Sequence, residues 1–175
     1  MVKKVAIRIS DPKKYHEMLR KLRERGIKVS EEGEIVITDN DINDLPLDVL
    51  IGKIICKIRG KEYFNELLIG IDTNKERLSI AIIGDGELIE SRTSNVIDIN
   101  DELSDIISSY PHKSLKIGVG GGNKIGELVY RIIKIKFSQA KIVNESKSSS
   151  PNNPFVQIKD RDIRAAYIIA LRSAL

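Results

Sequence analysis

Three acidic residues, Asp72, Glu145 and Asp162, stand where their carboxylates could meet. Asp72 ends an apolar run, Glu145 follows a short predicted strand, and Asp162 lies at the start of the last predicted helix. Carboxylates from separate segments are the ligands that hold hard divalent cations such as Mg²⁺, and Mn²⁺ accepts the same oxygen donors. Two such ions about 4 Å apart can stabilise both the attacking and the leaving oxygen of a phosphodiester. The three acids therefore predict a magnesium or manganese site suited to phosphodiester hydrolysis.

Each of these acids also has an ordinary structural interpretation. Asp72 could simply end a strand and cap a turn, and Glu145 could precede a polar loop with no further role. Asp162 could stabilise the helix dipole by up to about 1 kcal/mol without any catalytic role. Asp160 could replace Asp162 as the third acid if the last helix begins earlier.

The elements that would position these acids fill the second part of the chain. Alternation and turn residues predict strands, and apolar residues at helical spacing predict helices. The predicted order is strands 67–72, 77–83 and 87–93, helix 98–110, strand 115–119, helix 124–137, strand 141–144, and a helix from 160 onward. Gly84-Asp85-Gly86 predicts a tight hairpin turn, and the glycines at 120–122 predict a chain break. This order, βββαβαβα, predicts an α/β fold with an RNase H-like mixed five-stranded sheet and flanking helices.

The sequence of residues 1–65 predicts a small βαβ-like domain. Strands are expected at 5–9 and 34–38, and a helix at 13–25. Asp11-Pro12 supplies the N-cap and first position of this helix, and Gly26 ends it. A segment at 47–57 is compatible with a short helix or a third strand. We therefore expect a first domain of unknown role at 1–65 and an RNase H-like domain at 66–175.

Three motifs in the second domain resemble those of the RuvC/YqgF-like nuclease family. Gly70-Ile71-Asp72-Thr73-Asn74 resembles the first-strand motif G-[IL]-D-x-G. The segment 143–149 is similar to the D-E-R-L-[ST]-[ST] motif, and the segment 162–169 is similar to the D-x-x-A-A helix with the third acid. The resemblance covers residues of about 67 to 172, nearly all of the second domain. It implies an RNase H-like fold and a nuclease with Asp72, Glu145 and Asp162 as catalytic metal ligands.

The chain departs from these motifs at three positions. Asn74 replaces a glycine, Asn144 replaces the first acid of the Asp-Glu pair, and Ser146 replaces the arginine. The basic contact to a nucleic-acid phosphate is therefore expected from Lys147 or Arg164.

Composition narrows the class of protein without selecting a function. Of the 175 residues, 41% are hydrophobic and 31% are charged, a balance typical of globular domains. A net charge of +4 permits nucleic-acid binding without arguing for it. The single cysteine, Cys56, rules out an intramolecular disulfide and a cysteine-based zinc site. No apolar run is long enough for a membrane span, so a cytoplasmic protein without membrane contact is expected.

Three hypotheses follow for the function. The first is a Mg²⁺- or Mn²⁺-dependent endonuclease that cuts structured DNA or RNA. The second is a catalytically inactive RNase H-like module that binds nucleic acid or has a structural role, which the departures at Asn74 and Asn144 suggest. The third is an ATP-binding relative of the actin and sugar-kinase fold, suggested by the glycines at 118–122. Resolvases of the RNase H-like fold class work as dimers, because a DNA junction presents two strands to be cut. The resemblance therefore also implies a possible homodimer.

Overall fold

The computed structural model describes residues 3–146 and 158–175, and the chain forms two compact units. The N-terminal unit consists of the chain up to Phe64 together with Ile106–Pro111. The sheet unit consists of Asn65–Asp105 and His112–Leu175. Sequence patterns had given no indication that a segment near residue 110 belongs with the first unit.

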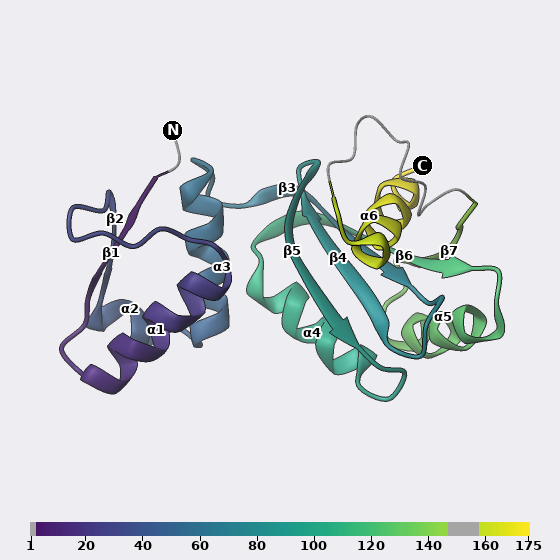
Figure 1. Ribbon diagram of the computed structural model, residues 1–175, viewed down its shortest axis with the longest axis horizontal. Helices are drawn as coiled ribbons and strands as arrows, with labels where there is room; N and C mark the ends of the chain where they lie inside the picture. The colour runs from purple at the N-terminus through teal and green to yellow at the C-terminus, as the bar shows by residue number, and fades with distance from the viewer. Residues whose placement is uncertain (1–2, 147–157) are drawn as a thin grey trace. The chain divides into compact units, whose positions relative to one another are not determined.

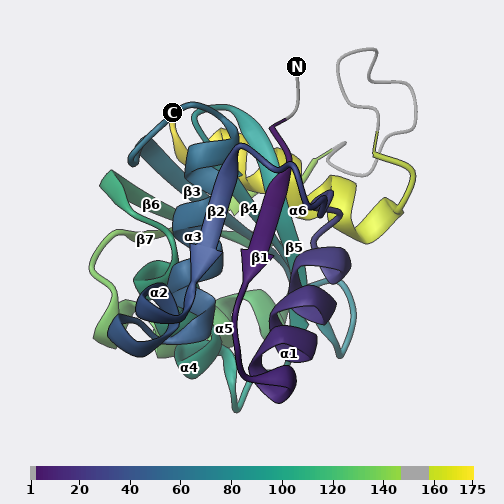
Figure 2. The same cartoon turned by 90° about the vertical axis from the view of Figure 1, so that its left-hand side faces the viewer.

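The N-terminal unit contains a βαβ arrangement. Its elements are β1 (Val5–Arg8), α1 (Pro12–Glu24), β2 (Ile35–Thr38), α2 (Asp39–Asp44) and α3 (Leu47–Ile58). The two strands pair in parallel and lie side by side in Figure 2. The caps of α1 are those that the sequence predicted: the Asp11 carboxylate accepts the N–H groups of the first turn, and Gly26 follows the helix with φ +69°.

Two features of this unit were not determined by sequence patterns. The ambiguous segment at 47–57 is the helix α3, whose residues Leu50, Ile51, Ile54 and Ile55 are buried. A short helix, α2, directly follows β2 and begins with a capping box between Thr38 and Asp41. Tertiary burial, rather than periodicity, decides the conformation of such short apolar segments.

Gly52 of α3 explains why the segment Ile106–Pro111 belongs to the N-terminal unit. A Cβ atom at this position would lie 1.8 Å from the carbonyl oxygen of Ser109, so the glycine allows the two backbones to approach closely. Phe64 makes a second contact with this segment, because its N–H donates to the carbonyl of Pro111 at 2.9 Å.

The sheet unit has the predicted order of elements, βββαβαβα. They are β3 (Phe64–Asp72), β4 (Leu78–Gly84), β5 (Glu87–Ser94), α4 (Ile99–Ser109), β6 (His112–Gly121), α5 (Lys124–Lys136), β7 (Ala140–Asn144) and α6 (Arg161–Ser173). As expected from the sequence, this is an α/β fold in which helices flank a five-stranded mixed sheet. Figure 1 shows α6 on one face of the sheet and α5 on the other.

The strands follow the order β5-β4-β3-β6-β7, with β3 in the centre. β4 is antiparallel to both β3 and β5, whereas β6 and β7 are parallel to each other. β3 and β6 run in the same direction, because Ser114 contacts Asn65 near one end and Asn123 contacts Thr73 at the other. The last residues of β3, β6 and β7 therefore share one edge of the sheet.

Two turn predictions had different outcomes. The Gly84–Gly86 turn is the predicted tight hairpin, with positive φ at both Asp85 (47°) and Gly86 (88°). The predicted chain break at 120–122 is wrong for its first two glycines, because Gly120 and Gly121 belong to β6 and pair with β7. Only Gly122, with φ 137°, has a backbone conformation that favours glycine.

Small residues let α6 cross the sheet at close range. A Cβ atom at Gly70 of β3 would lie 2.0 Å from the carbonyl oxygen of Ala166 and 2.7 Å from the Cβ of Ala170. A Cβ atom at Gly118 of β6 would similarly lie 2.8 Å from the Cβ of Ser173. This packing fixes the start of α6 near the end of β3, because Asp162 precedes Ala166 by about one helical turn and Asp72 follows Gly70 by two residues.

Throughout residues 3–146 and 158–175, every helix is too short or too polar to cross a membrane.

Candidate functional site

Asp72 ends the central strand β3 and is only 3% exposed. One of its oxygens, Oδ1, accepts hydrogen bonds from the backbone N–H of Asn74 at 3.3 Å and from the Asn74 side-chain amide at 2.7 Å. This is the local turn geometry that an aspartate favours at the end of a strand. The carboxylate is thus buried, and one of its two oxygens is hydrogen-bonded within its own turn.

Glu145 follows β7 and lies over the glycine backbone of β6. A Cβ atom at Gly120 would be 2.0 Å from Oε1 of Glu145, so the glutamate occupies the space that a side chain would need. The buried hydroxyl of Thr73 donates to the Gly120 carbonyl at 3.0 Å and lies 3.4 Å from the same Oε1 atom. The residue after Asp72 therefore connects β3 to the glutamate.

Asn123 strengthens this connection from the start of α5. Its side-chain oxygen accepts the N–H of Gly126 at 2.7 Å and caps the helix. Its amide nitrogen donates to the Thr73 carbonyl at 3.3 Å. The helix cap and the residue beside Asp72 are consequently held together.

Asp162 lies in the first turn of α6 and, together with Asp72, lines a cavity of about 330 Å³. Asp160 has the capping role instead, since its carboxylate accepts the N–H groups of Asp162 and Ile163. The cavity is lined by Asp72, Asn74, Lys75, Arg161, Asp162 and Ala165. Of the two acids considered for the third position, Asp162 is the one that lines the cavity.

Burial and neighbouring charge perturb two of the three acids. Burial raises the pKa of Asp72, and the Asp162 carboxylate raises it further, while hydrogen bonds from Asn74 oppose the change. Burial also raises the pKa of Glu145, followed by the effect of Asp72, and hydrogen bonds from Thr73 and Asn74 oppose it. Asp72 therefore interacts electrostatically with both other acids, and negative charge accumulates at this edge of the sheet.

Among the described residues, the basic side chains that line the cavity are Lys75 and Arg161. Lys147 lies outside the described residues. Arg164 turns back toward the start of its own helix, where Nη1 donates to the carbonyl of Ile158 at 2.7 Å. Lys75 Nζ lies 2.5 Å from Oδ2 of Asp162. No local sequence pattern pointed to Lys75, because its partner Asp162 is 87 residues away.

The donor atoms fit a hard cation, although the described residues contain no ready-made metal cluster. All three acids offer carboxylate oxygens, the donors that Mg²⁺ and Mn²⁺ prefer. A cation would also offset the burial and the neighbouring carboxylates that raise the pKa values of Asp72 and Glu145. Within residues 3–146 and 158–175, however, no three His, Cys, Asp or Glu side chains are grouped closely enough to hold a metal ion.

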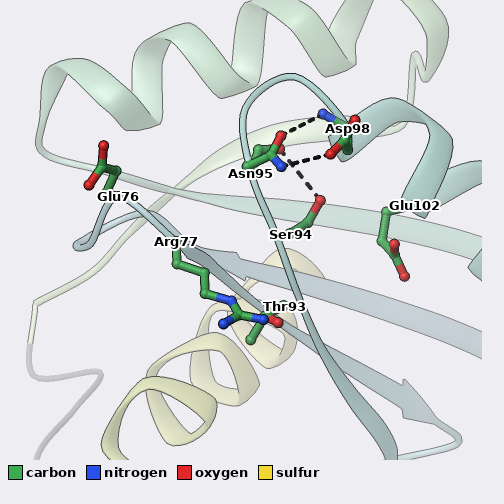
Figure 3. A pocket seen from close by; sticks show the side chains of 7 residues that line it. All are labelled: Glu76, Arg77, Thr93, Ser94, Asn95, Asp98 and Glu102. Carbon is green, nitrogen blue, oxygen red and sulfur yellow. Dashed lines mark hydrogen bonds between the residues drawn. The ribbon is translucent and has the colours of Figure 1, made fainter.

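A second, more open cavity of about 520 Å³ lies beside the turn between β3 and β4 (Figure 3). Its lining residues are Glu76, Arg77, Thr93, Ser94, Asn95, Asp98 and Glu102. Figure 3 shows Arg77 extending toward Thr93, while Asn95 is held by hydrogen bonds to Asp98. The mixture of one guanidinium and three carboxylates selects no ligand class, so the cavity at Asp72 is the stronger candidate site.

Comparison with known proteins assigns no family to this arrangement: no protein-family model, no curated protein and no solved structure matches the chain significantly.

Proposed function

We propose that the sheet unit is a Mg²⁺- or Mn²⁺-dependent nuclease of the RuvC/YqgF-like type, with an RNase H-like fold, that hydrolyses phosphodiesters in structured DNA or RNA. One observation carries the proposal: Asp72 and Asp162 come from separate elements but line one cavity, and Glu145 lies 3.4 Å from the hydroxyl of Thr73, the residue next to Asp72. The order of strands and helices and the motifs around the three acids support the same assignment.

In this proposal the three acids hold the cation, which would polarise the phosphodiester and activate water. Phosphodiester hydrolysis forms one P–O bond from water, breaks one ester P–O bond and leaves a phosphate and a hydroxyl end. Thr73 would orient Glu145 by sharing its single hydroxyl hydrogen between the Gly120 carbonyl and Oε1, 3.4 Å away. Lys75 and Arg161 at the cavity would attract the negatively charged backbone of the substrate.

A second function, a non-catalytic module of the same fold, is favoured by a specific pair of contacts. The Asn74 amide donates to Asp72 at 2.7 Å, and the Lys75 ammonium lies 2.5 Å from Asp162. Both contacts satisfy acids that a catalytic cation would need. A module of this kind would bind nucleic acid or a protein partner, including a second copy of the chain, without cutting.

Mn²⁺ binding measured by calorimetry separates the two functions. The nuclease requires binding at millimolar Mn²⁺ or tighter, and Asp72→Asn should abolish it because the central ligand loses its charge. Asp98→Asn is the matched control, because it removes one carboxylate from the other cavity of the same unit. Cleavage of branched DNA, duplex DNA and structured RNA would then be screened with the same proteins. If wild type binds no Mn²⁺ and cuts none of these substrates, the nuclease proposal fails and the non-catalytic module is preferred.

A further inference from the structure

Lys75 places a positive charge at one of the acids that the proposed nuclease would use for its cation. The lysine belongs to the turn between β3 and β4, and its Nζ lies 2.5 Å from Oδ2 of Asp162. Both residues line the cavity that also contains Asp72. The lysine side chain is 66% exposed, whereas that of Asp162 is 26% exposed.

Because Lys75 is the more exposed partner, it can leave the ion pair more easily than Asp162 can. Lysine carries a compact, strongly hydrated ammonium on a flexible stem, and water can solvate this group once it leaves the acid. Asp162 has less freedom, because α6 is fixed to the sheet by the close contacts at Gly70 and Gly118. Opening the pair therefore means moving the lysine while the carboxylate stays beside the cavity.

We infer that Lys75 is a displaceable internal counter-ion of Asp162, and that a divalent cation must release it before Asp162 can serve as a ligand. This inference rests on the proposed metal-dependent function. An ammonium and a divalent cation compete for the same carboxylate, since each repels the other at such short range. The lysine thereby lowers the metal affinity of the site.

The expected size of the effect follows from the exposure of the pair. The lysine is largely exposed and exposed ion pairs are weak, so removal of Lys75 should tighten Mn²⁺ binding by only about 1.5- to fivefold. The effect should shrink as KCl is added, because salt screens an exposed ion pair.

The test is Mn²⁺ binding to the full chain by calorimetry at low and high KCl. Lys75→Gln removes the counter-ion, and Lys75→Arg keeps a positive charge at the same position. Lys141→Gln is the control for net charge, because Lys141 is an exposed lysine on β7 of the same unit. We expect tighter binding for Lys75→Gln alone, with a ratio to wild type that approaches one at high KCl.

The outcomes separate the inference from the function on which it rests. If wild type binds Mn²⁺ but Lys75→Gln binds no more tightly, Lys75 does not compete for the site, and only the inference is overturned. If Lys141→Gln tightens binding equally, the effect comes from overall charge, which also overturns it. Binding by Lys75→Gln with none by wild type would support strong competition. If no variant binds Mn²⁺, the metal-dependent function itself is wrong.

Discussion

Gly120→Ala tests whether the backbone of β6 positions Glu145. The three atoms nearest to a Cβ at this position all belong to Glu145: Oε1 at 2.0 Å, Cδ at 2.7 Å and Cγ at 2.9 Å. Ordinary contact begins at 3.4 Å, so the carboxylate oxygen must move by about 1.4 Å. That displacement is large enough to break its 3.4 Å contact with the Thr73 hydroxyl.

The free energy of unfolding should change little, because two effects oppose each other. Alanine in place of glycine stabilises a protein by about 0.4–1 kcal/mol where the backbone tolerates it, and Gly120 is absent from the glycines with positive φ. A glutamate forced from its preferred rotamer costs about 0.5–1.5 kcal/mol. The free energy of unfolding should therefore lie within about 1 kcal/mol of that of wild type. Mn²⁺ affinity, by contrast, should fall by about 10- to 100-fold, as it does when a group that supports a metal ligand is lost.

A double-mutant cycle with Glu145→Ala isolates the predicted clash. Without the glutamate, the new methyl group at position 120 meets none of the three atoms that it would displace, and Gly120→Ala should then stabilise the chain by about 0.4–1 kcal/mol. Urea denaturation of wild type, both single variants and the double variant gives the coupling free energy. An additive cycle, in which Gly120→Ala has the same effect in both backgrounds, would show that Gly120 does not position Glu145.

Two further predictions concern charge in the sheet unit. Asp72→Asn should raise the free energy of unfolding at neutral pH. The pKa of Asp72 is raised in the folded state, so the protonated acid favours folding. This contribution is fully present below the usual pKa of 3.8 and is lost as pH rises through the folded-state pKa. Thermal melts should show the gap between variant and wild type closing on acidification, and a gap that widens would contradict the assigned cause. Arg92→Met should lower the free energy of unfolding by about 2–4 kcal/mol, since the arginine is 14% exposed and its loss leaves Glu90, Glu102 and Asp105 without a common cation. Arg92→Lys should lose less in urea denaturation, and equal losses would mean that packing rather than charge dominates.

The features that the sequence predicted well are those determined by neighbouring residues. The Asp11 cap, the turn at Asp85 and Gly86, and the order of elements in the sheet unit each follow from residues a few positions apart. Asp72 was located because it directly follows an apolar strand in that order. Local chemistry is sufficient in these cases because the relevant hydrogen bonds and φ values lie within one turn or one element.

The features that the sequence did not predict depend on contacts between distant segments. Gly120 was predicted to be part of a chain break, whereas it belongs to β6, and its lack of a side chain makes room for Glu145. Lys75 was overlooked because its partner Asp162 is 87 residues away. Arg164, the predicted phosphate contact, donates to the carbonyl of Ile158, which precedes α6. Neither periodicity nor spacing contains this information.

The turn at Asn74 and Lys75 bears on both proposed functions. Asn74, in place of a glycine, donates to Asp72, and its neighbour Lys75 neutralises Asp162. Both residues are exposed, so their contacts with the acids compete with water and are weak compared with direct coordination of a divalent cation. The buried groups behind them have other supports: Asp72 ends the central strand β3, and Thr73 donates to the Gly120 carbonyl. On this reasoning the turn weakens a metal site without abolishing it, and low metal affinity is the property that the nuclease hypothesis must accommodate.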